Sequence, residues 1–181
     1  KIFAYIGNMG IAQGMDIFIN LAKKLNNNKD LGFLFVGRGS EVPRLKACIK
    51  ELALSNILFF DEIDPQEIPG LLEQCHIGLL ALDPRHTTHN IPGKFLTYIL
   101  ASLPVLARVN AGTDLAHLIE VEGVGKVYVG DSVAELKTLA EEIIYNQKTY
   151  EYMASRGQDF AKNMFSTKTA VMQIINTIKF N

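Results

Sequence analysis

Short apolar runs alternate with amphipathic stretches along most of this 181-residue chain, and the alternation is what most restricts its fold. Most of the apolar runs hold almost no polar residue, which is typical of strands covered on both faces of a parallel sheet. The six predicted strands are Ile2–Ile6, Gly32–Val36, Ile57–Phe60 and residues 77–82, 105–109 and 125–129. Strict alternation with helices predicts an α/β fold, a Rossmann-like open parallel sheet with helices on both faces.

The predicted helices connect these strands and also form the end of the chain. They cover residues 14–25, 41–54, 65–74, 92–101, 113–121 and 132–146. Residues 147–181 hold no strand pattern and are expected to form one or two helices, with a break near Ser166 as the N-cap of a helix over 167–179. We therefore expect a single domain over residues 1–181. Its Rossmann-like core covers residues 1–146, and its C-terminal helical segment packs on this core or crosses to a partner domain.

Charge and composition exclude several function classes. The net charge is −1, so no broad basic field indicates nucleic-acid binding. No apolar run reaches the roughly 18 residues that span a bilayer, and no signal peptide is recognisable. The two cysteines and four histidines lack the spacing of a zinc site, so the cysteines are expected to be buried free thiols. Because the chain opens inside a strand without a Met, we expect it to be part of a longer protein.

Two glycine-containing loops follow the first two predicted strands, at the sheet edge where doubly wound proteins bind their ligands. In residues 7–14, glycines let the backbone approach a ligand, and the following helix start offers free N–H groups to a phosphate. The spacing matches neither a dinucleotide-binding nor a P-loop motif, so a turn without a ligand is the alternative. In the second loop Arg38 lies between two glycines, where it binds a base or a phosphate or lies in solvent. Ser40 is the expected N-cap of the next helix.

The loop after the third predicted strand is acidic. Asp64 is expected to cap a helix that begins at Pro65, with Glu67 as its capping-box partner. This makes Asp64 a structural residue. The backbone around Ile63 is better placed to form hydrogen bonds with the edge of a base.

The loop after the fourth predicted strand, residues 83–94, is the longest polar run in the chain. It contains Arg85 and two histidines, each of which either contacts a ligand or lies on the surface. Pro92 marks the start of a helix with Gly93 and Lys94 in its first turn. Free N–H groups of a helix start, together with a lysine ammonium, predict an anion site.

These four loops, in this order and spacing, resemble the C-terminal domain of the family 4 retaining glycosyltransferases, which have the GT-B fold. The resemblance covers nearly the whole chain. It is carried by Tyr5-Ile6-Gly7 with Gly14, Phe35-Val36-Gly37-Arg38-Gly39, Phe59-Phe60 with Asp64, Glu67 and Ile68, Ile91-Pro92-Gly93-Lys94-Phe95-Leu96-Thr97-Tyr98, and Leu103-Pro104-Val105-Leu106-Ala107. The Pro-Gly-Lys-Phe-Leu version is most similar to bacterial enzymes of O-antigen and capsule assembly, such as N-acetyl-L-fucosamine transferases.

The resemblance implies an enzyme that transfers a sugar from a nucleotide diphosphate sugar, with UDP favoured over GDP. It implies retention of the anomeric configuration and no metal or other cofactor. The acceptor, a glycan or a lipid-linked sugar of cell-surface polysaccharide synthesis, would be held by an N-terminal domain missing from this chain, which alone would be inactive. The family also implies a bacterial cytoplasmic protein acting at the inner face of the membrane, with peripheral membrane association of the full-length enzyme.

The resemblance also assigns binding residues, whereas it assigns no catalytic base and no metal site. The donor diphosphate would contact Gly7, Asn8, Gln13, Gly14, Gly93, Lys94 and Phe95. The nucleobase and ribose would contact Gly37, Arg38, Gly39, Ile63 and Thr97. The donor sugar would contact His89, Asn90 and Ile91.

Four of these positions depart from the family pattern. Asn8 and Gln13 stand where the family has an Arg and a Lys, so two cations are missing from the expected diphosphate site, and Lys94, Arg85 and the helix starts would have to compensate. His89 and Thr97 stand where the family has two glutamates that bind sugar hydroxyls. The departures keep two alternatives open: one half of a sugar-nucleotide epimerase, and an inactive nucleotide-sugar-binding module.

Overall fold

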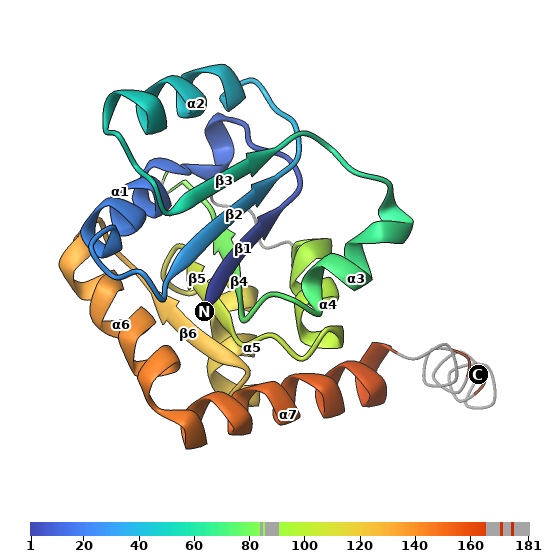
Figure 1. Ribbon diagram of the computed structural model, residues 1–181. Helices are drawn as coiled ribbons and strands as arrows, with labels where there is room; N and C mark the ends of the chain where they lie inside the picture. The colour runs from blue at the N-terminus through green and yellow to red at the C-terminus, as the bar shows by residue number, and fades with distance from the viewer. Residues whose placement is uncertain (84, 86–90, 166–170, 172–174, 176–181) are drawn as a thin grey trace.

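The computed structural model describes residues 1–83, 85, 91–165, 171 and 175 of the chain. Its centre is one six-stranded sheet in the order β3-β2-β1-β4-β5-β6, with every neighbouring pair parallel (Figure 1). The strands are β1 (Ile2–Ile6), β2 (Gly32–Val36), β3 (Ile57–Phe60), β4 (Ile77–Ala81), β5 (Val105–Arg108) and β6 (Gly125–Tyr128). The predicted Rossmann-like α/β fold is confirmed, and the last three strands end one residue earlier than predicted.

Helices cover both faces of the sheet. They are α1 (Asp16–Leu25), α2 (Val42–Glu51), α3 (Ile68–Leu72), α4 (Gly93–Leu100), α5 (Asp114–Glu122), α6 (Val133–Tyr145) and α7 (Gln147–Phe165), with 3-10 helices η1 (Ile11–Gln13) and η2 (Pro65–Glu67). One buried apolar cluster joins the sheet to α1, α2 and α6, and the other joins it to α3, α4 and α5. Helix α7 runs along the base of the domain (Figure 1) and contributes to both clusters, through Met153 to the first and Phe160 to the second.

Three helices of the described residues, η2, α5 and α6, begin at a side-chain cap, whereas α1 to α4 begin without one. The Asp64 carboxylate accepts a hydrogen bond from the Gln66 N–H at 2.8 Å, which confirms Asp64 as the N-cap of η2, whereas the predicted capping-box bond from the Glu67 side chain does not form. The hydroxyls of Thr113 and Ser132 cap α5 and α6 in the same way. The predicted cap at Ser40 is wrong: α2 begins one residue later, with Glu41 at the N-cap, because the turn that precedes it extends through residue 41.

The C-terminal prediction is confirmed in part. Residues 147–165 form α7 as expected, whereas the helix break predicted near Ser166 lies outside the described residues. Cys75 is buried and Cys48 is half-buried, both as free thiols. Within the described residues, no helix is long and apolar enough to cross a membrane.

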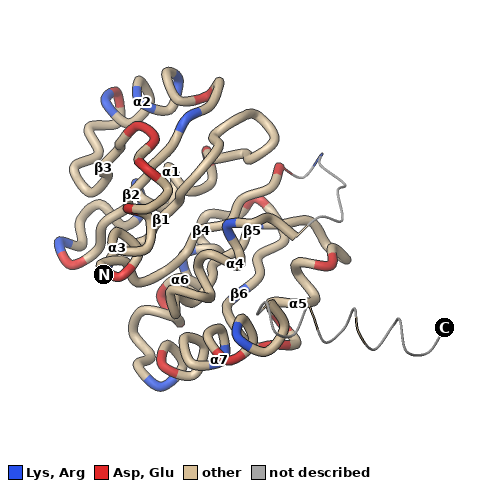
Figure 2. The backbone as a smooth tube through the Cα atoms, turned by 90° about the vertical axis from the view of Figure 1, so that its right-hand side faces the viewer, with Lys and Arg blue, Asp and Glu red and all other residues tan. Residues whose placement is uncertain are grey.

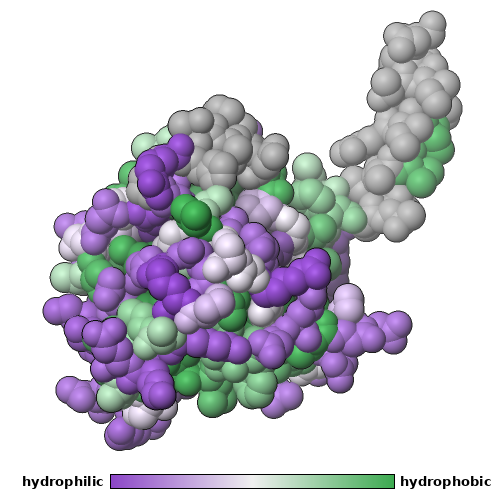
Figure 3. All heavy atoms as spheres, turned by 90° about the horizontal axis from the view of Figure 1, so that it is seen from above, coloured by the Kyte–Doolittle hydropathy of each residue, from purple (hydrophilic) through white to green (hydrophobic). Residues whose placement is uncertain are grey.

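The described part of the chain shows no broad field of one charge in the view of Figure 2. Helix α2 carries three basic residues and Glu51, and basic and acidic residues are interspersed on α7. Hydrophilic and hydrophobic side chains are likewise mixed over the described part of the face seen from above (Figure 3). The surface charge therefore indicates no binding site by itself. In open α/β sheets, ligands bind at the carboxyl ends of the strands.

Candidate nucleotide-binding site

The strand order reverses between β1 and β4, and these two strands separate toward their carboxyl ends. Their register covers only Phe3–Ile77 and Ala4–Gly78, whereas every other neighbouring pair is in register over at least four residues. The N–H of Ile6 instead donates to the hydroxyl of Tyr98, from α4, at 2.9 Å. The opening between the ends of β1 and β4, named the crevice below, holds the Tyr98 hydroxyl and lies at the reversal point, which is where open α/β sheets bind ligands.

Gly78 makes room for the Tyr98 ring. A Cβ on Gly78 would lie 2.4 Å from Cγ of Tyr98, so only glycine is compatible with the ring in this position. Tyr98 is completely buried, and burial raises the pKa of its hydroxyl above the ordinary value. The Tyr98 hydroxyl thus stays neutral and accepts the hydrogen bond of the Ile6 N–H in place of a backbone carbonyl of β4.

The loops after β1 and β2 lie backbone against backbone. Gly7 donates to the Val36 carbonyl at 2.9 Å, and Met9 donates to the Arg38 carbonyl at 2.7 Å. A Cβ on Gly37 would lie 2.1 Å from the Gly7 carbonyl oxygen, and φ of Gly37 is +143°, a conformation that side chains disfavour. The glycines thus allow the two loops to approach each other closely, and their predicted approach to a ligand stays a prediction.

Lys94, in the first turn of α4, extends into the crevice and reaches Tyr5 of β1. Its Nζ donates to the Tyr5 hydroxyl at 2.6 Å and lies 3.8 Å from the centre of the Tyr5 ring. A Cβ on Gly7 would lie 3.6 Å from the same nitrogen. Burial lowers the pKa of Lys94 to about 8, and no carboxylate of the described residues forms an ion pair with it.

A half-buried ammonium without a carboxylate is costly to the fold, which makes it a candidate for binding an anion. The N–H groups of the first turn of α4 carry a partial positive charge at the same place. Lys94 thus lies next to Gly7 and Gly93, as the predicted anion site requires.

Asn8 and Gln13, the two uncharged residues of the first loop, are bonded to each other. The Asn8 Nδ2 donates to Gln13 Oε1 at 3.2 Å, and the same oxygen accepts from the Gly10 N–H at 2.8 Å. The two side chains therefore stabilise the turn that leads into η1. They bring no charge to the crevice.

A cavity of about 210 Å³ lies beside Gly7, between the loops after β1, β2 and β3. Its walls include Gly7, Asn8, Gly37, Arg38 and Ile63, five of the predicted site residues. Its rim holds the exposed ion pair of Arg38 with Glu62, whose atoms are 3.2 Å apart. Gly7 links this cavity to Lys94, because it lines the cavity and a Cβ on it would lie 3.6 Å from the Lys94 ammonium, which is not part of the cavity wall.

Other predicted site residues lie differently. Phe95 is fully buried in the core and its N–H donates to the Pro92 carbonyl at 2.9 Å, so it has no free group for a phosphate. The exposed Thr97 bonds back to the Gly93 carbonyl within α4 at 3.3 Å. Ile91 is exposed. His89 and Asn90 lie outside the described residues.

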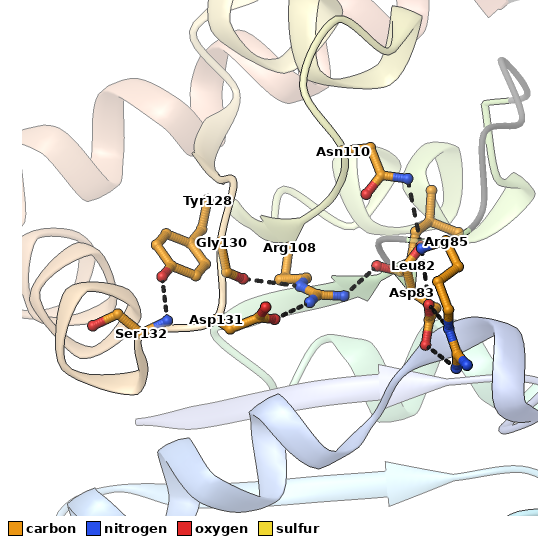
Figure 4. A network of polar contacts seen from close by, with 9 residues as sticks. All are labelled: Leu82, Asp83, Arg85, Arg108, Asn110, Tyr128, Gly130, Asp131 and Ser132. Atoms are coloured by element: carbon orange, nitrogen blue, oxygen red, sulfur yellow. Dashed lines mark hydrogen bonds and ion pairs between the residues drawn. The ribbon is translucent and has the colours of Figure 1, made fainter.

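A second polar cluster at this edge, around Arg108 at the end of β5, was not predicted (Figure 4). Its guanidinium is 5% exposed and donates to the carbonyls of Leu82, at 2.7 Å, and Gly130, at 3.2 Å, and to the carboxylate of Asp131. It thereby ties together the ends of β4, β5 and the loop after β6. The sequence signal was an arginine ending an apolar strand.

Arg85, which was expected to help neutralise a phosphate, is paired. Its guanidinium donates twice to the Asp83 carboxylate, each time at 2.8 Å, and the pair holds the pKa of Asp83 far below its usual range. Asp83 and Arg85 line a cavity of about 420 Å³ that Arg108 and Asp131 complete. Arg85 and Lys94 were the side chains expected to compensate for Asn8 and Gln13, and of the two only Lys94 has no carboxylate partner within the part of the chain that the structure describes.

Within the described residues, no group of three or more His, Cys, Asp or Glu side chains is arranged to hold a metal ion. The metal-independent reaction stays a prediction.

Residues 1–160 match the family model for glycosyl transferases group 1, and the chain belongs to this family. It is 24% identical over 143 residues to the probable glycosyltransferase WbjE of Pseudomonas aeruginosa, covering 79% of this chain and 36% of WbjE. It is 27% identical over 180 residues to the putative colanic acid biosynthesis glycosyl transferase WcaI of Escherichia coli K12, covering 99% and 43%. The chain thus spans less than half the length of both relatives.

Solved structures of glycosyltransferases share the fold. The structure of Alr3699/HepE from Anabaena in complex with UDP superposes with a TM-score of 0.81, at 19% identity, over 99% of this chain and 49% of that protein. The six-stranded parallel sheet of this chain thus shares its fold with about half of that protein. At this identity the likeness concerns the fold alone.

Proposed function

We propose that this chain is the donor-binding half of a retaining glycosyltransferase that uses a UDP-sugar. The observation that carries the proposal is the half-buried Lys94 ammonium, which lies beside Gly7 and has no carboxylate partner among the described residues. Such a group is stabilised when an anion binds and destabilises the domain when none does. A diphosphate is an anion of suitable charge for this position.

The donor would lie across the sheet edge in three parts. Its base would occupy the cavity of about 210 Å³ lined by Arg38 and Ile63, next to Gly7. Its diphosphate would lie between Gly7 and the first turn of α4, within reach of the Lys94 ammonium. Its sugar would extend toward the loop after β4, where the family resemblance places the sugar contacts at His89, Asn90 and Ile91.

The chemistry assigned to this half is stabilisation of the leaving group. When the bond between the sugar and the diphosphate breaks, negative charge develops on the diphosphate oxygen. Lys94 and the start of α4 are positioned before the reaction to stabilise that charge without a metal ion. The acceptor and any base that assists its attack would belong to a second domain of a longer protein.

The likeness to named relatives supports a biological setting. The relative WcaI is named for colanic acid biosynthesis, and the HepE structure contains UDP. We propose a UDP-linked rather than a GDP-linked donor and a glycan or lipid-linked acceptor of bacterial cell-surface polysaccharide, modified at the cytoplasmic face of the membrane. The specific likeness to N-acetyl-L-fucosamine transferases of family 4 belongs to the same proposal.

A thermal shift assay with nucleotides tests the binding step. At a UDP concentration one hundred times Kd, binding stabilises the folded state by about 2.7 kcal/mol, which for a domain of this size raises Tm by roughly 5–10 °C. The Lys94→Met variant, which keeps the side-chain length and removes the charge, is expected to lose most of this increase. If UDP, GDP and their sugars all leave the Tm of the unmodified chain unchanged, the proposal is wrong.

One alternative retains support from the structure, namely an inactive nucleotide-sugar-binding module. It is favoured by Asn8 and Gln13, which stand where the family has two cations. These two uncharged side chains form a hydrogen bond with each other. Transfer of labelled sugar by the full-length protein would decide between the two. The epimerase alternative has no comparable support, because Asp61, Glu62 and Asp64 are engaged with Lys46, Arg38 and the start of η2.

A further inference from the structure

The Tyr5 hydroxyl forms two hydrogen bonds, and their directions are fixed by chemistry. It donates to the Asn8 carbonyl at 2.7 Å and accepts from Lys94 Nζ at 2.6 Å. A phenol has one proton, so once this proton is given to Asn8, the oxygen can only accept from Lys94. The hydroxyl therefore offers the ammonium a fixed acceptor.

The Tyr5 ring reinforces this orientation. The ammonium lies 3.8 Å from the ring centre, within the range of a cation–π attraction. Tyr5 is completely buried in the core cluster on the α1 side, whereas Lys94 comes from α4 on the opposite face of the sheet. Lys94 thus crosses the opening between β1 and β4 to reach a side chain that cannot move.

We propose that Tyr5 is the positioning residue of the anion site, which directs the Lys94 ammonium toward Gly7 and keeps it protonated. The inference rests on the proposed binding of a diphosphate at Lys94. Tyr5 itself does not touch the donor: it acts through Lys94 and through the carbonyl of Asn8 in the first loop.

The proposal has a consequence for the pH dependence of binding. Among the described residues, the polar groups near Lys94 are the Tyr5 hydroxyl from β1, which it contacts, and the neighbouring Tyr98 hydroxyl from α4, and burial raises the pKa of both phenols so that they stay neutral. Lys94 is the group that titrates, with a pKa of about 8. Diphosphate binding that needs the charged form is strong below this pH and is lost as the pH rises through it. Removing the Tyr5 hydroxyl takes a hydrogen bond from the charged form, so its pKa falls further.

Two Tyr→Phe variants separate positioning from structure. Y5F removes the hydroxyl that holds Lys94, whereas Y98F removes the hydroxyl that holds the Ile6 N–H and leaves the Lys94 contact in place. Both replace a buried phenol beside the crevice by an isosteric ring. If the loss of UDP affinity came from a general destabilisation of the fold, it would appear in both variants.

UDP affinity is measured by calorimetry between pH 7 and pH 10, above the second phosphate pKa of about 6. The K94M variant supplies the baseline, because ionisation of UDP itself affects every variant alike. Relative to this baseline, the unmodified chain should lose up to about tenfold in affinity between pH 7 and pH 9. In Y5F the affinity at pH 7 should fall by about 3- to 30-fold and the midpoint should move to lower pH, whereas in Y98F the midpoint should stay and only Tm should fall.

The outcomes distinguish this inference from the proposed function. If no UDP binding is detected in the unmodified chain, the proposed function fails. If UDP binds and K94M removes the pH dependence, but Y5F has the same midpoint as the unmodified chain, the role of Tyr5 is overturned while the donor site stands. If Y98F shifts the midpoint as much as Y5F does, the effect is structural and the inference is likewise overturned.

Discussion

Replacing Lys94 by Met should stabilise the domain in the absence of ligand, although it removes two contacts. The fall of the Lys94 pKa from 10.5 to about 8 corresponds to about 3 kcal/mol of unfavourable charge burial. The lost hydrogen bond to Tyr5 offsets about 1 kcal/mol of this, and the lost cation–π contact offsets about another 0.5–1. The net prediction is a gain of about 1–2 kcal/mol at pH 7.

The pH dependence of this gain follows from proton binding. Between about pH 8 and pH 10.5 the unfolded chain holds the Lys94 proton more tightly than the folded chain does, so the stability of the unmodified protein rises with pH in this window. The advantage of K94M should therefore be largest at pH 7 and shrink above pH 8.

Urea unfolding of the unmodified chain and of K94M at pH 7 and pH 9.5 measures both effects. Lys24→Met, at an exposed lysine of α1, is the matched control and should change stability by less than about 0.5 kcal/mol. A K94M protein that is less stable than the unmodified chain at pH 7 would refute the reasoning, because it would make Lys94 a structural residue with a favourable net interaction.

Two further substitutions test the framework of the site. Gly37→Ala places a Cβ 2.1 Å from the Gly7 carbonyl oxygen at a φ of +143°, so it should cost roughly 2–6 kcal/mol and lower UDP affinity, as Tm and calorimetry would record. An Ala variant with unchanged Tm would show that the two loops are not held together as described. Arg108→Met should cost about 2–4 kcal/mol in urea unfolding, because it leaves two carbonyls without their donor. Asp131→Asn should cost less than about 1, because the Asp131 side chain is 81% exposed, and equal costs for the two variants would contradict this assignment.

The strands could be predicted from the sequence because buried parallel strands are nearly continuous apolar runs. Three strands match residue for residue, and the other three end one residue early where the apolar run continues into the loop. The cap at Asp64 was predictable because Asp-Pro is a local signal. The absence of a cap at Ser40 was not predictable, because serine is the preferred residue at an N-cap, whereas the turn before α2 extends through Glu41 and places that residue at the N-cap.

The site was predictable only as a set of loops. Glycine spacing and the helix start indicated that Gly7, Gly37 and Lys94 lie at one edge, and they do. The roles of Tyr5 and Tyr98 were missed because a tyrosine in an apolar run looks like core, and its partner is 89 or 92 residues away. Only the separation of β1 and β4 brings these side chains together.

Two residues that were expected at the phosphates, Phe95 and Arg85, are engaged in contacts within the fold that the sequence pattern does not reveal. Phe95 follows Lys94 in the first turn of α4, but its side chain faces the core and its N–H is bonded to Pro92. Arg85 belongs to the same loop as the predicted sugar contacts, but its guanidinium forms an ion pair with Asp83, two residues before it. In both cases, which groups are free is decided by contacts within the fold.

Chemical-shift mapping of the isotope-labelled chain with UDP tests the central claim most directly. The claim predicts saturable shifts at the backbone amides of Gly7, Gly37, Ile63 and Gly93, with smaller shifts around Arg108 and Asp131. It predicts that K94M weakens these shifts and leaves the spectrum of the folded domain intact. Shifts confined to the cavity around Arg108, or the same titration in K94M as in the unmodified chain, would contradict it.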